Sequence, residues 1–260
     1  MLKILRLYAS VAATAFLRSL RAWPVALAVL LYFAIMALGS TLLGRLGLAG
    51  GFILGFVEAA CISSYLALLA VAVNGSKVTW GDLQSSFTAL LWDVIGVLFA
   101  LWILSFVVEA LTRAAPDRAL FIQAAYGLLI GIFLNPVPEL IYQRRAPGRT
   151  TELLFASARF VQEHWIEWFL PNLAIGAAIL GLAFGAAGLS PRELMVSLPS
   201  LVSLQGAFLL GPTLLASGSS LWVAPLVLAF CHFAMLFRGL LFKELSTGGW
   251  RGRALRSSWR

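Results

Sequence analysis

Charged side chains are scarce in this sequence. Asp, Glu, Lys and Arg together make up 12% of the residues, whereas hydrophobic residues make up 61%. Soluble domains average about a quarter charged and about half apolar residues, so the composition excludes an ordinary soluble domain. Several apolar runs reach about 20 residues, the length that a helix needs to cross a bilayer. We therefore predict a single integral membrane domain over residues 1–260.

Cysteine, histidine and the common catalytic motifs are also lacking. Cys61 and Cys231 fall inside apolar runs with no CxxC pair, which excludes a disulfide framework and makes them small buried hydrophobes. With only two histidines and no CxxC pair, the sequence offers too few of the usual ligands for a zinc site. No HExxH, GxSxG, P-loop or GxGxxG-then-helix motif occurs. We predict no catalytic residue, no metal and no cofactor, and an intramembrane enzyme is the least favoured class.

What is present is basic charge beside the apolar runs, with a net charge of +8. No aromatic-interleaved basic patch occurs, so we expect anionic lipid headgroups as the partner and no nucleic acid. In a six-span layout, fifteen Lys and Arg residues lie on the inner side and four on the outer side. This bias predicts that both termini face the cytoplasm, and we expect a bacterial inner membrane.

Six apolar segments are predicted to cross the membrane, which gives an all-α polytopic bundle. They cover about residues 23–43, 49–73, 91–111, 119–134, 169–189 and 221–241. Residues 195–217 are apolar too, but they contain prolines and polar side chains. A seventh full span there would export the basic tail, 243–260, so we expect a re-entrant or interfacial segment. The sequence leaves open which of these it is.

Two further segments are predicted to lie in the membrane surface as amphipathic helices. The first is 1–21, whose apolar side is predicted to face the acyl chains through Leu2, Leu5, Tyr8, Val11, Ala12 and Phe16. The second belongs to a cytoplasmic hinge, 135–168, that begins at the Asn-Pro-x-Pro-Glu break. Its helix over 150–167 should meet the next span at a steep bend near Pro171. The competing interpretation is one straight helix from Thr151 to Leu189.

The hinge carries a family resemblance. The stretch ARFVQEHWIEWFLPNL, residues 158–173, places an in-plane amphipathic helix directly before a span. In this layout the chain resembles the membrane domain attached to some glycerophosphodiester phosphodiesterases, and similar stand-alone six-span bacterial families. The resemblance covers the membrane module only, and it implies no activity.

Polar residues inside spans are candidates for function because they are costly there. Glu58 lies in GFILGFVEAACISSYLALL and could be a proton or cation site, an interhelical ion pair, or a hydrogen-bonded structural residue. His232 follows Cys231 in the last span. Adjacent residues point about 100° apart on a helix, which favours a structural histidine bonded across helices over a Cys-His site.

The hinge supplies the candidate interface or partner-binding residues. They are Asn135, Glu139, Arg144, Arg145, Glu163, Glu167, Trp168 and Asn172. The carboxylates among them could serve acid–base chemistry or bind a cation. Alternatively, they pair with Arg144, Arg145 and Arg159 at the headgroups, which we favour because Arg159 and Glu163 are four residues apart.

These observations favour a non-catalytic multi-pass protein that serves as a membrane-embedded subunit or scaffold of a larger assembly. A protein partner or a homo-oligomer is then expected. The alternative is a small transporter or permease component in which Glu58 and the broken segments line a path.

Overall fold

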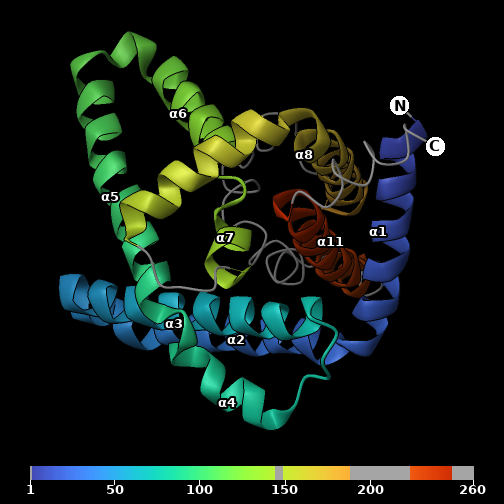
Figure 1. Ribbon diagram of the computed structural model, residues 1–260. Helices are drawn as coiled ribbons and strands as arrows, with labels where there is room; N and C mark the ends of the chain where they lie inside the picture. The colour runs from blue at the N-terminus through green and yellow to red at the C-terminus, as the bar shows by residue number, and fades with distance from the viewer. Residues whose placement is uncertain (1, 144–148, 188–222, 248–260) are drawn as a thin grey trace.

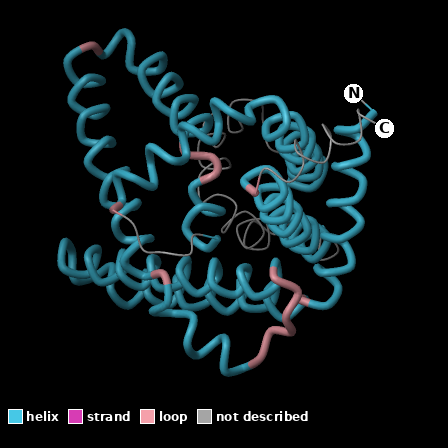
Figure 2. The backbone as a smooth tube through the Cα atoms, in the orientation of Figure 1, coloured by secondary structure: helices cyan, strands magenta, loops and turns pink. Residues whose placement is uncertain are grey.

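The computed structural model describes residues 2–143, 149–187 and 223–247, and every element in these ranges is a helix (Figures 1 and 2). The predicted all-α class is confirmed. Four segments of this described part are long and apolar enough to cross a membrane. They are Trp23–Val73, Leu91–Ala114, Pro116–Gln143 and Pro225–Ser246. The predicted segment 195–217 lies outside the described residues, and the count of six spans stays a prediction.

The first of these segments is a helical hairpin. Helix α2 (Trp23–Leu43) turns through a short 3-10 helix, η1 (Gly44–Leu46), into α3 (Gly47–Val73), and the two long helices lie side by side (Figure 1). Pro24 fits the first turn of α2, where a missing N–H costs little. Gly47 has φ +58, a left-handed conformation that glycine adopts without strain. The hairpin follows from this Gly-rich link.

The first and last helices of the described residues, α1 (Leu2–Arg21) and α11 (Val223–Ser246), pack against each other. The buried stripe of α1 is formed by Leu7, Val11 and Ala15. Val11 was expected to face lipid and is instead covered by protein, whereas Leu5 and Phe16 are exposed as expected. Helix α1 therefore has two apolar sides, and its placement in the membrane surface stays a prediction.

Both terminal helices are tied to the end of α3. Gly75, with φ +83, ends α3 in a left-handed turn. Arg18 Nη1 of α1 donates to the carbonyl of Val73, and Lys243 Nζ of α11 donates to Asn74 Oδ1 at 3.0 Å. Cations at a helix C-terminus interact favourably with its dipole and its unpaired carbonyls. This corner fixes α1, α3 and α11 relative to one another.

Helix α4 (Trp80–Ala89) begins with a capping box, in which Asp82 Oδ2 accepts from the backbone N–H and the hydroxyl of Thr79. Its other side is held by buried hydroxyls. Ser64 shares hydrogen bonds with Tyr32 of α2 and Ser86 of α4. Buried polar groups need such partners, so this chain of hydroxyls fixes α4 against the α2–α3 hairpin.

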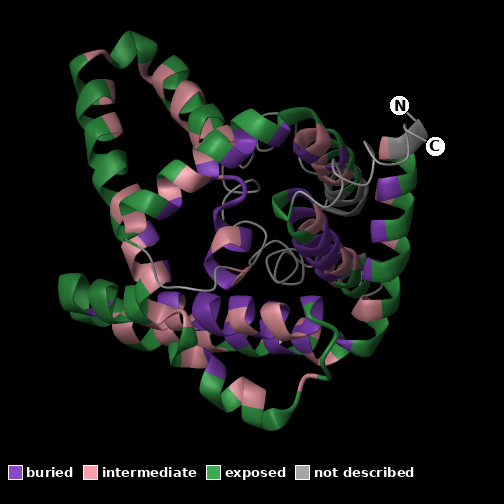
Figure 3. Ribbon diagram, viewed as in Figure 1, coloured by how far each residue is buried: buried purple, intermediate pink, exposed green. Residues whose placement is uncertain are grey.

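A second hairpin projects from the rest of the molecule. Helix α5 (Leu91–Ala114) and α6 (Ala119–Phe133) are joined by a short 3-10 helix, η2 (Pro116–Arg118). Exposed residues cover most of the hairpin's length (Figures 1 and 3). In the most apolar 18-residue window of α5, 11% is buried, against 61% in α11. This hairpin has the lowest cover from its own chain among the candidate spans.

Helix α7 (Val137–Gln143) is a short central segment, and α8 (Thr150–Ala187) follows it. Helix α8 is bent, because His164 has non-helical angles (φ −131, ψ 24). The straight helix of the competing interpretation is therefore excluded. The bend lies at His164 rather than near Pro171, which sits inside the second half. The first half contacts the α5–α6 hairpin, where Ser157 Oγ donates to Phe133 O at 2.5 Å. Its predicted position in the membrane surface stays a prediction.

Candidate functional site

The candidate site is built around the break between α6 and α7. Pro136 has no N–H, and the chain turns through Asn135 before α7 starts, with Val137 N donating to Leu134 O at 3.1 Å. This turn carries Glu139 into the interior, where it has no exposed surface. The proline pair thus does more than end a span, because it positions a carboxylate among apolar helices.

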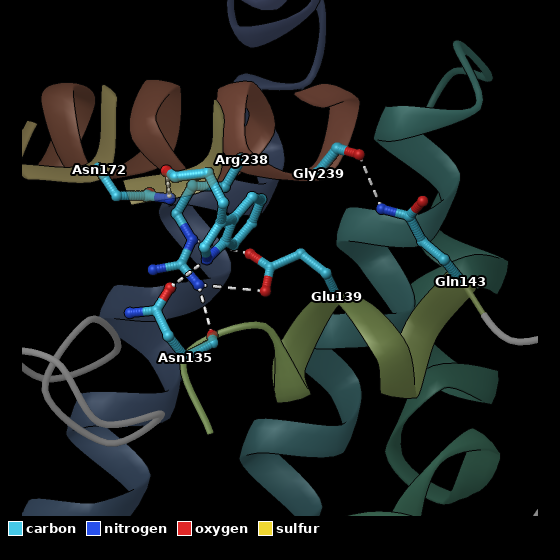
Figure 4. A network of polar contacts seen from close by, with 7 residues as sticks. Asn135, Glu139, Gln143, Asn172, Arg238 and Gly239 are labelled. Carbon is cyan, nitrogen blue, oxygen red and sulfur yellow. Dashed lines mark hydrogen bonds and ion pairs between the residues drawn. The ribbon is translucent and has the colours of Figure 1, made fainter. Parts of the chain in front are cut away.

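Arg238 of α11 is the partner of Glu139. Its Nε lies 2.8 Å from Glu139 Oε1 and its Nη2 lies 3.1 Å from Oε2, so the pair is bidentate (Figure 4). Nη2 also donates to the carbonyl of Asn135 at 2.7 Å. Two charges buried together offset their desolvation cost only with such geometry and added hydrogen bonds. The ion pair therefore fixes α7 to α11.

Trp168 of α8 joins the pair from a third direction. Its indole N–H donates to Asn135 Oδ1 at 2.8 Å, and its ring centroid lies 5.3 Å from the Arg238 Cζ. The indole is fully buried and packs edge-on against Phe160, with centroids 5.4 Å apart. A guanidinium over an aromatic face is an attractive arrangement. Three separate segments, the α6–α7 break, α8 and α11, therefore converge on one polar centre.

A close backbone approach flanks this centre. Gln143 Nε2 donates to the carbonyl of Gly239 at 2.8 Å (Figure 4). A Cβ added to Gly239 would lie 2.3 Å from the Tyr142 hydroxyl oxygen and 2.8 Å from Val73 Cγ2. Only glycine allows α7 and α11 to approach this closely, so Gly239 is part of the arrangement that places Arg238 beside Glu139.

The second half of α8 continues through a proline because another helix supplies the missing donor. Pro171 cannot donate to the carbonyl of Glu167, four residues earlier. The Tyr8 hydroxyl of α1 donates to that carbonyl at 3.0 Å. Burial, and secondarily the Glu167 carboxylate, raises the pKa of Tyr8 to about 12, so the phenol remains a donor at neutral pH. At the next carbonyl, Asn172 Nδ2 donates to Trp168 O at 2.6 Å.

The structure brings together only part of the predicted interface set. Asn135, Glu139, Trp168 and Asn172 gather at the polar centre. Glu163 is exposed and Glu167 is half-buried. Arg144 and Arg145 lie outside the described residues. The expectation that Glu139 pairs with the hinge arginines at the headgroups is wrong, because its carboxylate is turned inward to Arg238.

The two predicted intramembrane residues lie elsewhere. Glu58 is half-buried on α3, and His232 is buried on α11. Neither ring nitrogen of His232 has a hydrogen-bond partner of normal geometry among the described residues, although the backbone of Ser19 on α1 lies near enough to interact with the imidazole. The expected bond across helices is therefore not formed at normal geometry there. No group of three His, Cys, Asp or Glu residues in the described part of the chain could hold a metal ion.

Sequence reasoning missed Arg238. It was counted with the basic residues of the inner membrane surface, although it stands inside the apolar run LVLAFCHFAMLFRGLLF. The rule that singled out Glu58, a charge within a span, applies equally to Arg238. It could have identified the residue, although not its partner.

The geometry of this centre favours a positioning role. The charges of Glu139 and Arg238 cancel, and both carboxylate oxygens accept from the guanidinium.

Comparison of the chain with models of protein families, with curated proteins and with solved structures gives no match. What the protein does must therefore be argued from its own residues.

Proposed function

We propose that this protein is a non-catalytic multi-pass membrane protein that serves as a membrane-embedded subunit or scaffold of a larger assembly. The observation that carries the proposal is the contrast between its two parts. The polar centre around Glu139 holds α7, α8 and α11 in one arrangement. The α5–α6 hairpin, in contrast, is apolar and lies largely uncovered by its own chain. A fixed bundle with a projecting apolar hairpin suits a subunit that receives a neighbour.

The proposal includes six spans in a bacterial inner membrane, with both termini in the cytoplasm and anionic lipid headgroups around the basic ends. The positive-inside bias supports this topology. Cysteines introduced at Ser76 and Asp117 test it, because the six-span layout places these exposed residues on opposite sides. Both labelling from the same side with a membrane-impermeant reagent would contradict it.

The test of the function is purification from native membranes in a mild detergent or polymer nanodiscs, followed by native mass spectrometry. We expect the chain in a complex of fixed stoichiometry, with other proteins or with itself. A mock purification from membranes lacking the tagged chain is the control. Recovery of a monomer alone, from both media, would contradict the proposal.

One observation favours a second candidate, a small transporter or permease component. Ionisable residues inside membrane segments often mark substrate or ion paths, and broken helices often form the sites of transporters. Glu139 and Arg238 combine both features, since the carboxylate follows the α6–α7 break. Flux into liposomes that contain the purified protein decides between the candidates. Flux that is lost in Glu139→Gln but kept in Asp117→Asn, at an exposed acid of η2, would favour the transporter if protein recovery is equal.

A further inference from the structure

Helix α5 carries an ordered row of exposed side chains, which we call the α5 outer stripe. It consists of Phe99, Trp102, Phe106, Glu109 and Arg113. These residues are spaced alternately by three and four positions, which places them on one side of a helix. The Trp102 ring stacks on Phe99 with centroids 5.7 Å apart and meets Phe106 edge-on at 4.5 Å. The stripe is thus a preformed aromatic surface that ends in one acid and one base.

The chain's own contacts use another side of α5. Val94 and Val97 are buried, and the Tyr126 hydroxyl of α6 donates to Leu101 O at 3.4 Å. Exposed residues predominate along the α5–α6 hairpin (Figure 3). The described residues leave the three aromatic side chains of the stripe exposed, so lipid or another chain can cover them.

Trp102 is poorly matched to lipid. It lies 11 residues after the start of α5 and 12 before its end, so it sits near the middle of a candidate span. Tryptophan favours the membrane–water interface, where its N–H can meet water or headgroups. Here the side chain is 51% exposed, and its indole N–H donates no hydrogen bond within the described residues. Hydrocarbon offers no acceptor, whereas a packed protein surface offers ring faces and polar atoms.

We propose that a second copy of this chain packs along the α5 outer stripe, which forms a two-fold interface between parallel α5 helices. The inference rests on the proposed function and names the neighbour. Two copies inserted in the same direction place the same residues at the same depth. A two-fold axis then requires a surface that complements itself. In such a pair the two Glu109 side chains share one layer and the two Arg113 side chains share the next. The acids and bases therefore alternate along the interface and their charges cancel.

The heptad geometry gives the contacts. In a parallel pair with this 3–4 spacing, Trp102 of one copy packs among the aromatic rings of the other stripe. Glu109 meets Arg113 of the second copy one layer further along. Within one chain these two side chains already form an exposed ion pair. When the dimer forms, each side chain can replace its partner in the same chain by the opposite charge of the second copy, so no charge is buried without a countercharge. The exposed aromatic rings become covered, which is the source of affinity in such an interface.

A charge-reversal mixture tests this arrangement. Glu109→Arg places two cations on each stripe, and Arg113→Glu places two carboxylates there. Energy transfer between differently labelled chains, in liposomes at a fixed protein-to-lipid ratio, measures the dimer. We expect each variant alone to associate about ten-fold more weakly than wild type or worse, and the mixture of the two to recover association. A mixture that associates no better than either variant alone overturns the proposal.

Cysteine cross-linking provides a measurement that does not depend on charge. In a background where Cys61 and Cys231 are replaced by Ala, Phe99→Cys and Phe106→Cys should form cross-linked dimers in native membranes. Leu104→Cys is the matched control, because Leu104 is also apolar and exposed but lies about 200° around the helix from Trp102. Equal cross-linking at all three positions, or none at any, overturns the proposal.

The failure of this inference is distinguishable from failure of the proposed function. A complex with a different protein, recovered without stripe cross-links, overturns the two-fold interface and leaves the subunit function standing. A monomer with neither cross-links nor a co-purifying protein overturns both.

Discussion

Glu139 and Arg238 lie 99 residues apart in the chain, yet they form a bidentate ion pair in which the carboxylate has no exposed surface. The pair links the segment that follows the α6–α7 break to the last described helix. Because Trp168 covers the guanidinium and binds Asn135, the same contact also orients the second half of α8.

Removing one member of this pair should destabilise the protein strongly. Glu139→Gln and Arg238→Met should each cost about 3–5 kcal/mol, since each leaves a buried charge without its countercharge. The double variant should cost clearly less than the sum, which reversible denaturation in mixed micelles can measure. Asp117→Asn, at an exposed acid of η2, is the control and should cost under about 1 kcal/mol. Additive costs for the single variants would contradict a coupled pair.

Gly239→Ala should destabilise the contact between α7 and α11. The added Cβ meets the Tyr142 hydroxyl and Val73 at distances that atoms cannot adopt, so the helices must separate. We expect a loss of about 1–3 kcal/mol in the free energy of unfolding. Gly176→Ala is the matched control, because nothing lies within 4 Å of its added Cβ and alanine favours a helix interior. Equal effects at both glycines would show that the close approach is unimportant.

The Tyr8 hydroxyl should matter only while residue 171 is proline. Tyr8→Phe leaves the Glu167 carbonyl without its donor and should cost about 1–3 kcal/mol. In a Pro171→Ala background, the backbone N–H of residue 171 can donate to the same carbonyl, and the cost of Tyr8→Phe should shrink. A double-mutant cycle on thermal unfolding in detergent measures this coupling. A coupling energy near zero would mean that the two residues act independently.

The start of α4 should weaken in acid. Hydrogen bonds from the Thr79 hydroxyl and N–H hold the pKa of Asp82 below its ordinary value of 3.8. A depressed carboxyl pKa stabilises the folded state above the unfolded pKa, and this stabilisation is lost as the pH falls through the lower folded value. We expect amide exchange at the start of α4 to accelerate below about pH 4 in wild type.

Two variants control this experiment. Asp82→Asn should lack the acid-dependent step, because its side chain does not titrate. Thr79→Val removes the hydroxyl donor, so the carboxyl carbon signal of Asp82 in NMR should titrate closer to the ordinary value. An unchanged titration of Asp82 in Thr79→Val would show that the Thr79 hydroxyl is not the cause of the lowered pKa of Asp82.

Much of the helical layout could be predicted from apolar runs and helix-breaking residues. The run predicted at 91–111 corresponds to α5 at Leu91–Ala114, and Pro136 and Pro138 correctly predicted a break after 134. These features are local, since each depends on residues within one or two helical turns. The same kind of local signal, a position in the predicted hinge, identified four of the candidate site residues: Asn135, Glu139, Trp168 and Asn172.

The long-range relationships could not be predicted in this way. No spacing rule pairs Glu139 with a residue on a distant helix, so its carboxylate was assigned to nearby arginines. The bend of α8 was expected near Pro171, where the backbone lacks a donor. It lies instead at His164. At Pro171 the helix continues, because the Tyr8 hydroxyl donates to the carbonyl of Glu167, which Pro171 leaves without a backbone donor. Both errors concern a partner supplied by another helix.

The distance along the chain between Glu139 and Arg238 also sets an order of events during synthesis. At elongation rates of about 5–20 residues per second, the 99 residues from the one after Glu139 up to Arg238 take roughly 5–20 s to add. Throughout that interval the carboxylate has no countercharge, and an unpaired charge is costly in an apolar interior. Segment α7 must therefore wait near water or headgroups until α11 arrives. The synthesis of α11 therefore determines when α7 can take its buried position.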